Sequence, residues 1–305
     1  MKLIAPSYFN DFKCIAGACR HSCCVGWEID VDPISYIKYM NMPGEFGELI
    51  RKHLAVGDSG PYFAMTEEGR CPFLNEDGLC DMIIALGEES LCQICDDHPR
   101  FRNFFSDREE IGLGLCCEAA GRLILGYKEP VKLFTIEADG KSPKNDEFED
   151  DLLDIRDEVI AGIQDRSAPM MERVRALMKE IGISPDIDYA EWAGCLMGLE
   201  RLDDNWLYML EELQTAEFEY DMDAWEVPLE QLMVYLLYRH VPAALDDECI
   251  DLHIAFCCIM WLIVRKLCAI REQLTFEDVV EICRMYSSEI EYSDENIDAI
   301  LGKIC

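Results

Sequence analysis

Apolar residues recur at the spacing of an α-helix through most of the second half of the chain. Positions three and four residues apart share one face of a helix, so a segment that keeps this spacing over several turns predicts a helix with a buried face. Thr275 followed by Asp278 has the form of a capping box at the start of one segment. The segments are 151–163, 170–181, 192–213, 226–238, 253–270 and 276–286. They predict an all-helical domain over 151–305.

The first half of the chain has shorter and less regular elements. Alternating apolar and polar residues at 27–32 predict a short strand. Asp32 followed by Pro33 then predicts the cap and first residue of a helix that runs to about Met40. The other predicted elements are a helix at 44–54, a turn at 75–78, short helices at 80–86 and 89–96, a hairpin at 101–115 and a helix at 118–127.

Residues 137–150 separate the two patterns, because they contain Gly, Pro and many charges but few side chains to bury. We interpret them as a linker. The predicted fold class is mainly α. A cysteine-rich metal-binding domain with short strands and a hairpin occupies 1–136, and an acidic all-helical domain occupies 151–305.

The chain of 305 residues carries 61 acidic and 27 basic side chains, a net charge of −34. Residues 1–128 hold 12 basic and 20 acidic side chains, net −8, so the remaining −26 falls on the rest of the chain. Affinity for nucleic acid depends on neutralising phosphates, so this balance argues against a nucleic-acid partner. The acidic second part could attract a basic segment of a protein partner, or it could be a solvated surface.

The longest apolar run, 254–264, is about half the length needed to cross a bilayer, and we predict a buried helix there. The first residues lack the apolar core and cleavage site of a signal peptide. We therefore expect a cytoplasmic protein with no membrane partner.

Cysteine is the most informative residue type, with 17 in the chain. Seven are scattered, several of them in apolar helical segments, where cysteine behaves as a small hydrophobic residue. Ten lie within 14–117 in short irregular segments, and without a secretion signal a disulfide framework is not expected. Metal or iron–sulfur ligation explains the cluster better. The ten are Cys14, Cys19, Cys23, Cys24, Cys71, Cys80, Cys92, Cys95, Cys116 and Cys117.

The spacings are C-x4-C-x3-C-C, C-x8-C, C-x2-C and C-C. Neighbouring cysteines rarely ligate one small ion together, so the count favours several metal centres, or one centre with spare thiols. The radical S-adenosylmethionine signature is absent, because Gly26 stands where its third cysteine would be. A Rossmann-type glycine turn is also absent, since the nearest match, 112–115, falls in the predicted hairpin.

Four motifs occur in order: CIAGACRHSCCVGWEIDVD, CPFLNEDGLC, GEESLCQICDDHPR and LCCEAAGRLIL. Over about residues 5–127 the chain resembles the flagellin lysine-N-methylase (FliB-type) family, which is related to the CxxCxxCC group of zinc- or iron-chelating proteins. The helical remainder resembles it in length and character. The resemblance implies an enzyme that carries an iron–sulfur cluster, with 4Fe–4S expected and zinc as the alternative. It also implies methyl transfer from S-adenosylmethionine to lysine side chains of flagellin.

The resemblance also implies which residues bind metal. Cys92 falls where the family varies, Cys117 stands in place of a common proline and His98 in place of a common aromatic residue, so Cys92 and Cys117 could be ligands or packing residues. The cysteines that match the family pattern are Cys14, Cys19, Cys23, Cys24, Cys71, Cys80, Cys95 and Cys116.

Each of several other residues has two possible interpretations. Arg20 and His21 could contact the cosubstrate or the cluster sulfurs, or form a surface pair. Arg100 could bind a carboxylate, or pair with Asp96 or Asp97. Trp27 is interpreted as a core anchor.

His240 and His253 lie in apolar helical segments, and we interpret both as core or capping residues. No catalytic base can be named, although methyl transfer requires a neutral lysine. The alternative functions are a non-catalytic zinc- or iron-chelating module, an electron-transfer module, or an enzyme that modifies another peptide.

Overall fold

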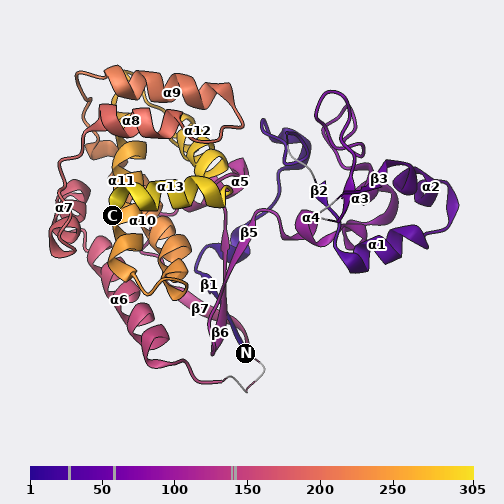
Figure 1. The fold of residues 1–305 in the computed structure, drawn as a ribbon, viewed down its shortest axis with the longest axis horizontal. Helices are drawn as coiled ribbons and strands as arrows, with labels where there is room; N and C mark the ends of the chain where they lie inside the picture. The colour runs from indigo at the N-terminus through magenta and orange to yellow at the C-terminus, as the bar shows by residue number, and fades with distance from the viewer. Residues whose placement is uncertain (27–28, 58–59, 139, 141–142) are drawn as a thin grey trace. The chain divides into compact units, whose positions relative to one another are not determined.

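The computed structural model describes residues 1–26, 29–57, 60–138, 140 and 143–305. The chain forms two compact units. We call Met1–Phe12 together with Phe101–Cys305 the helical unit, and Lys13–Arg100 the thiol unit. Figure 1 shows the elements of both.

A four-stranded sheet in the order β5-β6-β1-β7 belongs to the helical unit. Strand β1 is parallel to β6, with Ile4 opposite Glu110, and antiparallel to β7, with Ile4 opposite Thr135. The hydroxyl of Tyr238 donates to the carbonyl oxygens of Ile4 and Ile111 at 3.3 and 3.2 Å, which fastens the sheet to a helix. The strands are β1 (Lys2–Pro6), β5 (Arg100–Phe104), β6 (Arg108–Leu113) and β7 (Leu133–Ala138).

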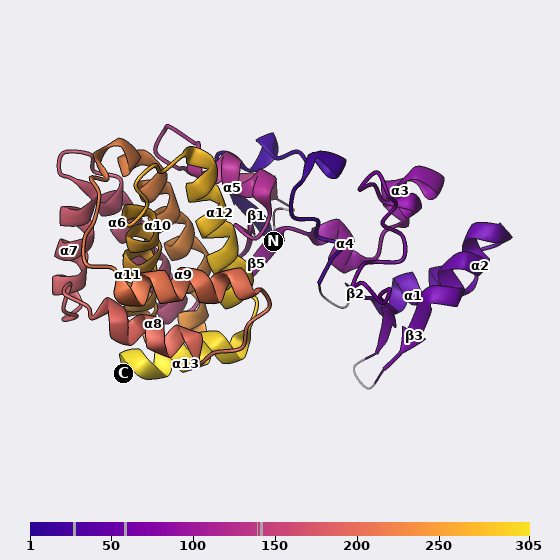
Figure 2. The same ribbon diagram turned by 90° about the horizontal axis from the view of Figure 1, so that it is seen from above.

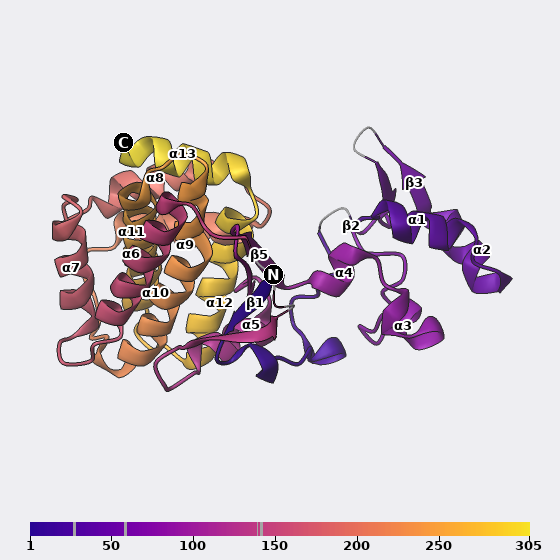
Figure 3. The same ribbon diagram turned by 90° about the horizontal axis from the view of Figure 1, so that it is seen from below.

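Two long helices, α10 and α11, form the centre of the helical unit, and Figures 2 and 3 show the other helices around them. Sixteen residues of α11 are buried, so this helix is apolar on every side. The indole nitrogen of Trp261 donates to the carbonyl oxygen of Leu229 at 2.8 Å and joins α11 to α10. The helices are α5 (Glu118–Leu125), α6 (Glu147–Ile163), α7 (Met170–Glu180), α8 (Tyr189–Met197), α9 (Asp204–Thr215), α10 (Glu226–His240), α11 (Ile250–Ala269), α12 (Phe276–Tyr286) and α13 (Asp294–Ile304).

Helix α11 is long and apolar enough to cross a membrane by length and composition. Of its most apolar window, 89% is buried inside the protein, as for the core helix of a globular domain. The prediction of a buried helix over 254–264 is confirmed.

The thiol unit has a smaller core around an antiparallel three-stranded sheet in the order β2-β4-β3. Phe63 and Phe73 pack edge to face with their ring centroids 5.0 Å apart, and Tyr39 and Ile50 are fully buried with them. The elements are β2 (Ile29–Asp30), α1 (Pro33–Met40), α2 (Gly44–His53), β3 (Leu54–Val56), β4 (Pro61–Phe63), α3 (Asp81–Leu86) and α4 (Gln93–Asp97).

Most predicted elements are present. Asp32 accepts hydrogen bonds from the backbone nitrogens of Ile34 and Ser35 and caps α1, and Thr275 and Asp278 form the predicted capping box. Trp27 and part of the strand predicted at 27–32 lie outside the described residues, as do parts of the linker predicted at 137–150.

One helix prediction was wrong, because 192–213 is broken into α8 and α9. The carboxylate of Glu289 accepts hydrogen bonds from the backbone nitrogens of Leu202 and Asp203, both at 2.8 Å, and holds the break in place. Asp203 then caps α9. A tertiary contact of this kind leaves no local pattern in the sequence.

The two compact units divide the chain at other positions than the predicted domains 1–136 and 151–305. Residues 101–138 belong with the helices, because their strands pair with β1 and their buried side chains pack on the helical core. The segment from 151 onward is helical throughout, as predicted, but it shares its compact unit with a sheet.

Candidate functional site

Several cysteines come together in the thiol unit, where separate segments of its chain meet. The backbone nitrogen of Cys71 donates to the carbonyl oxygen of Cys24 at 2.7 Å, and the residues next to them also pair as an antiparallel bridge. Cys92 caps the start of α4, and the backbone nitrogen of Cys95 donates to its carbonyl oxygen at 3.1 Å. Cys71 and Cys92 are buried. The fold of this unit therefore places two pairs of thiols in one core.

Each pair shares a proton unequally. Hydrogen bonds from Cys23 and Cys71 lower the pKa of the Cys24 thiol, and the bond to Cys24, with burial, raises the pKa of Cys71. In the second pair the hydrogen bond from Cys95 lowers the pKa of Cys92, while the pKa of Cys95 is raised. Thiolates are the metal-binding form of cysteine, so the lowered pKa values of Cys24 and Cys92 favour the form that binds metal.

Cys80 and His98 are both close enough to Cys24 for its charge to shift their pKa values. Burial raises the pKa of the Cys80 thiol, and the charge of Cys24 adds to this effect. Burial lowers the pKa of His98, against the attraction of Cys24. An imidazole with a lowered pKa is neutral near pH 7 and is a good ligand for zinc or iron.

The donor chemistry of this cluster fits a thiophilic metal, since thiolates and a neutral imidazole are the ligands of zinc and iron–sulfur centres. In the part of the chain that the structure describes, no group of three or more Cys, His, Asp or Glu side chains has the arrangement of a metal site. All 17 cysteines lie in that part, and all are free thiols. We name Cys24, Cys71, Cys80, Cys92, Cys95 and His98 the thiol cluster.

The first cysteine motif lies mostly at the surface of the thiol unit. Cys14 and Cys23 are exposed, and Cys14 Sγ accepts a hydrogen bond from the backbone nitrogen of Ala16 at 3.3 Å. Cys19 Sγ donates to the carbonyl oxygen of His21 at 3.2 Å. Arg20 and His21 are both exposed. Of this motif, Cys23 and Cys24 hydrogen bond to each other and so connect it to the thiol cluster.

Arg100 donates from Nη1 to the carbonyl oxygen of Asp96 at 3.0 Å. This contact to a backbone oxygen closes the end of α4, and both interpretations of Arg100 stay predictions.

Cys116 and Cys117 belong to the helical unit. Cys117 precedes α5 and packs partly against the helical core. Cys116 Sγ donates to the hydroxyl of Tyr292 at 3.1 Å. Burial raises the pKa of Cys116 to about 11, so this thiol stays protonated near pH 7.

A buried charge network lies next to Cys116 and was not predicted from the sequence. Glu291 Oε2 accepts hydrogen bonds from the hydroxyls of Tyr235, at 2.5 Å, and Ser287. Glu291 Oε1 contacts His240 Nε2 at 2.8 Å. The Arg239 guanidinium donates to the Tyr235 hydroxyl at 3.0 Å and to the Glu291 carbonyl oxygen at 3.1 Å. We name these five residues the Glu291 network.

The charges in this network stabilise one another. Burial alone would raise the pKa of Glu291, but Arg239, His240 and Ser287 outweigh it and lower the pKa to about 2. The Arg239 guanidinium also lies between two aromatic rings, 4.9 Å from the centroid of Phe101 and 4.7 Å from that of Tyr292. Tyr292 is 52% exposed, so the buried network reaches the surface through its ring.

The sequence holds only a weak signal for this network. Glu291 lies at the end of a short π-helix, Ser287–Glu291, and such segments occur often at functional positions. His240 and His253 are both buried, as predicted, and each contacts a carboxylate. The identity of the carboxylate partner of His240, 51 residues away, could not be predicted.

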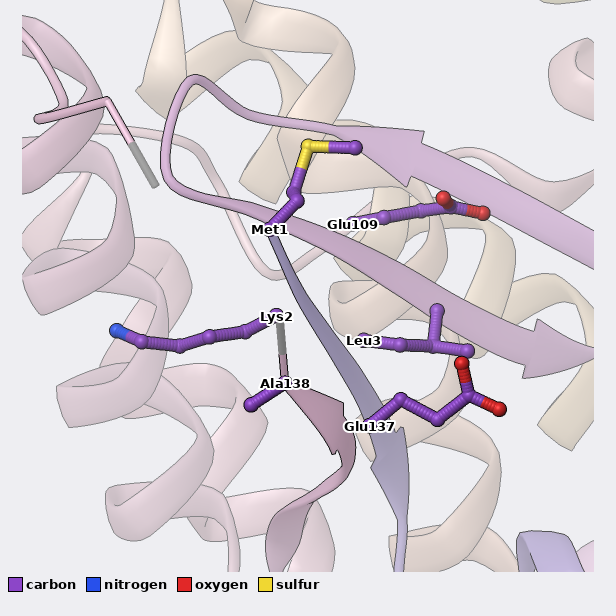
Figure 4. A pocket seen from close by; sticks show the side chains of 6 residues that line it. All are labelled: Met1, Lys2, Leu3, Glu109, Glu137 and Ala138. Carbon is purple, nitrogen blue, oxygen red and sulfur yellow. The ribbon is translucent and has the colours of Figure 1, made fainter. Parts of the chain in front are cut away.

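A shallow hollow of about 290 Å³ lies where β1 begins. Figure 4 shows Leu3, Glu109 and Glu137 on one side of the strand and Lys2 pointing away on the other. Glu109 is already paired with Arg102 at 2.5 Å. The hollow has neither an apolar floor nor a nucleophile and is a weak candidate for a catalytic site.

Comparison with known proteins gives matches in sequence only. The chain is 28% identical over 134 residues to the Lysine-N-methylases of Salmonella choleraesuis and Salmonella typhimurium, covering 42% of this chain and 33% of each relative. It is 29% identical over 134 residues to the Flagellar biosynthetic protein FliU of Salmonella muenchen, covering 79% of that protein. These matches span about a third of the length of the two Lysine-N-methylases. No solved structure matches.

The sequence pattern of the FliB lysine N-methylase C-terminal domain matches residues 111–304. This range takes in the last residues of β6, every helix from α5 to α13, Cys116 and the whole Glu291 network. Because it is more than half of the chain, it settles the family that the cysteine motifs suggested: this chain belongs to the FliB lysine N-methylase family.

Proposed function

We propose that this protein is a protein lysine N-methyltransferase that uses S-adenosylmethionine. The observation that carries the proposal is the family match over residues 111–304, together with relatives named Lysine-N-methylase. The relative named Flagellar biosynthetic protein FliU supports a flagellar protein, with flagellin as the first candidate substrate.

The proposed reaction moves a methyl group from a sulfonium sulfur to the lysine nitrogen. The nitrogen–carbon bond forms as the sulfur–carbon bond breaks, the sulfur keeps the bonding electron pair, and the amine loses one proton. The attacking lysine must be neutral, so its site has to favour the uncharged amine. Glu291 is already engaged by three side-chain partners and is therefore proposed to position Arg239 and Tyr235 rather than to accept this proton.

We also propose that the thiol cluster holds an iron–sulfur centre, with zinc as the alternative. Its ligands would come from Cys24, Cys71, Cys80, Cys92 and Cys95, because these thiols already lie in one core. Such a centre supplies metal–thiolate bonds that stabilise the loops around it. The chain itself contributes the paired thiols, of which one in each pair has a lowered pKa.

The test is anaerobic purification of the full chain with iron and sulfide analysis, followed by incubation with labelled S-adenosylmethionine and flagellin. Mass spectrometry of flagellin lysines should show added methyl groups. Unmodified lysines, together with no measurable binding of the donor, would overturn the methyltransferase proposal. A metal-loaded but inactive protein would then favour the chelating or electron-transfer function, which the thiol cluster alone also supports.

The test variant for the metal centre is Cys24→Ser, and its matched control is Cys305→Ser. Cys24 accepts hydrogen bonds from two other thiols, whereas Cys305 is exposed at the end of the chain. Loss of bound metal in the first variant and not in the second would place the centre at the thiol cluster. Full metal content in both would reject that placement.

A further inference from the structure

A second pocket, of about 370 Å³, lies within the helical unit and has a composition unlike the rest of this acidic chain. The first half of α7, the connection to α8, the start of α8, the segment after α9 and the last turns of α11 line it. Its apolar wall comes from Met171, Pro185, Ile187 and Leu262. The volume is within the range of small-molecule sites, which starts at about 300 Å³.

Two cations, Arg175 and Arg265, and two carboxylates, Asp186 and Glu219, line this pocket, and a third cation, Lys266, pairs with Glu219. Glu219 accepts from Arg265 at 2.6 Å through one oxygen and from Lys266 at 3.1 Å through the other. These two hydrogen bonds outweigh the effect of burial and lower the pKa of Glu219. Asp186 lies on the rim, and Arg175 lines the pocket from α7.

Arg175 is the unusual member of this group. Among the residues that the structure describes, Arg175 has no ion pair or hydrogen bond, although the protein has 61 acidic side chains and 27 basic ones. Arg265, in contrast, is held in place by Glu219. An exposed guanidinium at the mouth of a pocket is a natural partner for a carboxylate, which it can bind through two parallel hydrogen bonds.

Tyr189 adds an aromatic surface and a polar end. Its ring lies under the Lys266 ammonium, 5.2 Å from nitrogen to centroid. Burial raises the pKa of Tyr189 to about 12, so its hydroxyl stays protonated and can donate a hydrogen bond. Asp186 on the rim could pair with an ammonium group.

We propose that this pocket binds a small ligand with an α-amino-acid end and an apolar chain. The carboxylate would pair with Arg175, the ammonium with Asp186, and the chain would lie on Met171, Ile187 and Leu262. Free methionine and the methionyl half of a sulfonium donor share this chemistry. The proposed function is needed for one step only, which is the assignment of S-adenosylmethionine as the natural ligand of this pocket.

The test is isothermal titration calorimetry of the full chain with S-adenosylhomocysteine, S-adenosylmethionine and methionine. We expect saturable binding of at least one of the three and about 10- to 100-fold weaker binding by Arg175→Gln, as for the loss of a charge-assisted contact. The matched control is Lys179→Gln, an exposed cation on the same helix that does not line the pocket. It should bind like the unmodified protein.

The outcomes separate the pocket from the reaction. Binding that Arg175→Gln leaves unchanged, or that Lys179→Gln weakens equally, would overturn the pocket while leaving the methyltransferase proposal standing. No binding of any of the three probes would also overturn it. Arg175-dependent binding without methyl transfer would support the pocket and reject the proposed function. Methionine binding as tightly as S-adenosylhomocysteine would show that the amino-acid end is the part recognised.

Discussion

The two units use the same residue type in opposite ways. In the helical unit Cys257, Cys258, Cys268 and Cys283 are fully buried, and burial raises the pKa of each thiol. These cysteines stay protonated and pack as small hydrophobic groups. In the thiol unit four cysteines form two hydrogen-bonded pairs, Cys24 with Cys71 and Cys92 with Cys95, and one thiol of each pair has a lowered pKa. Cysteine content alone therefore says little about chemistry, whereas proximity between thiols says much.

The units also differ in what holds them together. The helical unit has one large apolar core, with buried ion pairs inside it. Among its described residues, the thiol unit has a core of nine buried residues, two of them cysteines. A small core gains comparatively little from burial, and metal bonds can supply the rest. The first prediction tests this difference directly.

The largest expected effect is that of Cys71→Ser. Cys71 is buried and hydrogen bonds to Cys24, so the variant removes a proposed ligand from the middle of the thiol cluster. We expect metal content and methylation activity to fall below detection, while most of the helical circular dichroism remains. Metal analysis and circular dichroism of the same sample check this. A collapse of the whole helical signal would contradict the separate folding of the two units.

A second prediction concerns the ion pair that joins the sheet to α6. Glu110 and Arg156 are both fully buried, with contacts at 2.6 and 3.0 Å. Arg156→Met leaves the carboxylate buried and unpaired, which costs about 3–5 kcal/mol. Urea unfolding followed by circular dichroism measures the change.

The control for this pair is Arg102→Gln at the edge of the same sheet. Arg102 pairs with Glu109 at 2.5 Å, but both side chains reach solvent. Such surface pairs contribute about 0–1 kcal/mol. An equal loss in free energy of unfolding in Arg156→Met and Arg102→Gln would mean that burial does not decide how much these ion pairs stabilise the protein.

The third prediction is a pH dependence of the helical unit. Glu291 has a pKa of about 2 in the folded protein, below its usual value of 4.5. A carboxylate with a lowered folded pKa stabilises the protein above its unfolded pKa, and this contribution is lost as pH falls from about 4.5 to 2. The loss should reach about 3 kcal/mol.

Glu291→Gln should flatten the stability profile between pH 4.5 and 2, because the glutamine does not titrate. Thermal unfolding at a series of pH values checks this. A profile with the same slope in both proteins would show that other carboxylates are responsible. The surface carboxylate Asp154 offers a control, since Asp154→Asn should leave the slope unchanged.

Local signals account for what the sequence predicted correctly. Helical spacing marked nearly every helix after residue 150, and cap residues marked the starts of α1 and α12. The cysteine spacings predicted a metal site, which stays a prediction, and the spacings alone could not show which cysteines pair. The fold brings His98 near Cys24, whereas the sequence showed His98 only as a departure from the family pattern.

Contacts between distant segments account for what the sequence could not show. Strands β1 and β7 are far apart in the chain and form one sheet only after folding, so neither was predicted. The Glu291 network likewise joins residues 51–56 positions apart. Arg175 has no carboxylate partner among the described residues, and this depends on where the carboxylates lie in the folded chain, which no local pattern shows.

The smallest expected effect is that of two cysteine substitutions in the helical unit, one at a buried position and one at an exposed position. Cys257 is fully buried in α11, so Cys257→Ser places a hydroxyl in an apolar core and should cost about 1–2 kcal/mol. Cys305→Ser, at an exposed position, should cost less than about 0.5 kcal/mol. Neither should change the metal content. Urea unfolding and metal analysis of both variants check this. If Cys257→Ser lowered the metal content as Cys71→Ser is expected to, the buried cysteines of α11 would have a chemical role, and the contrast between the units would fail.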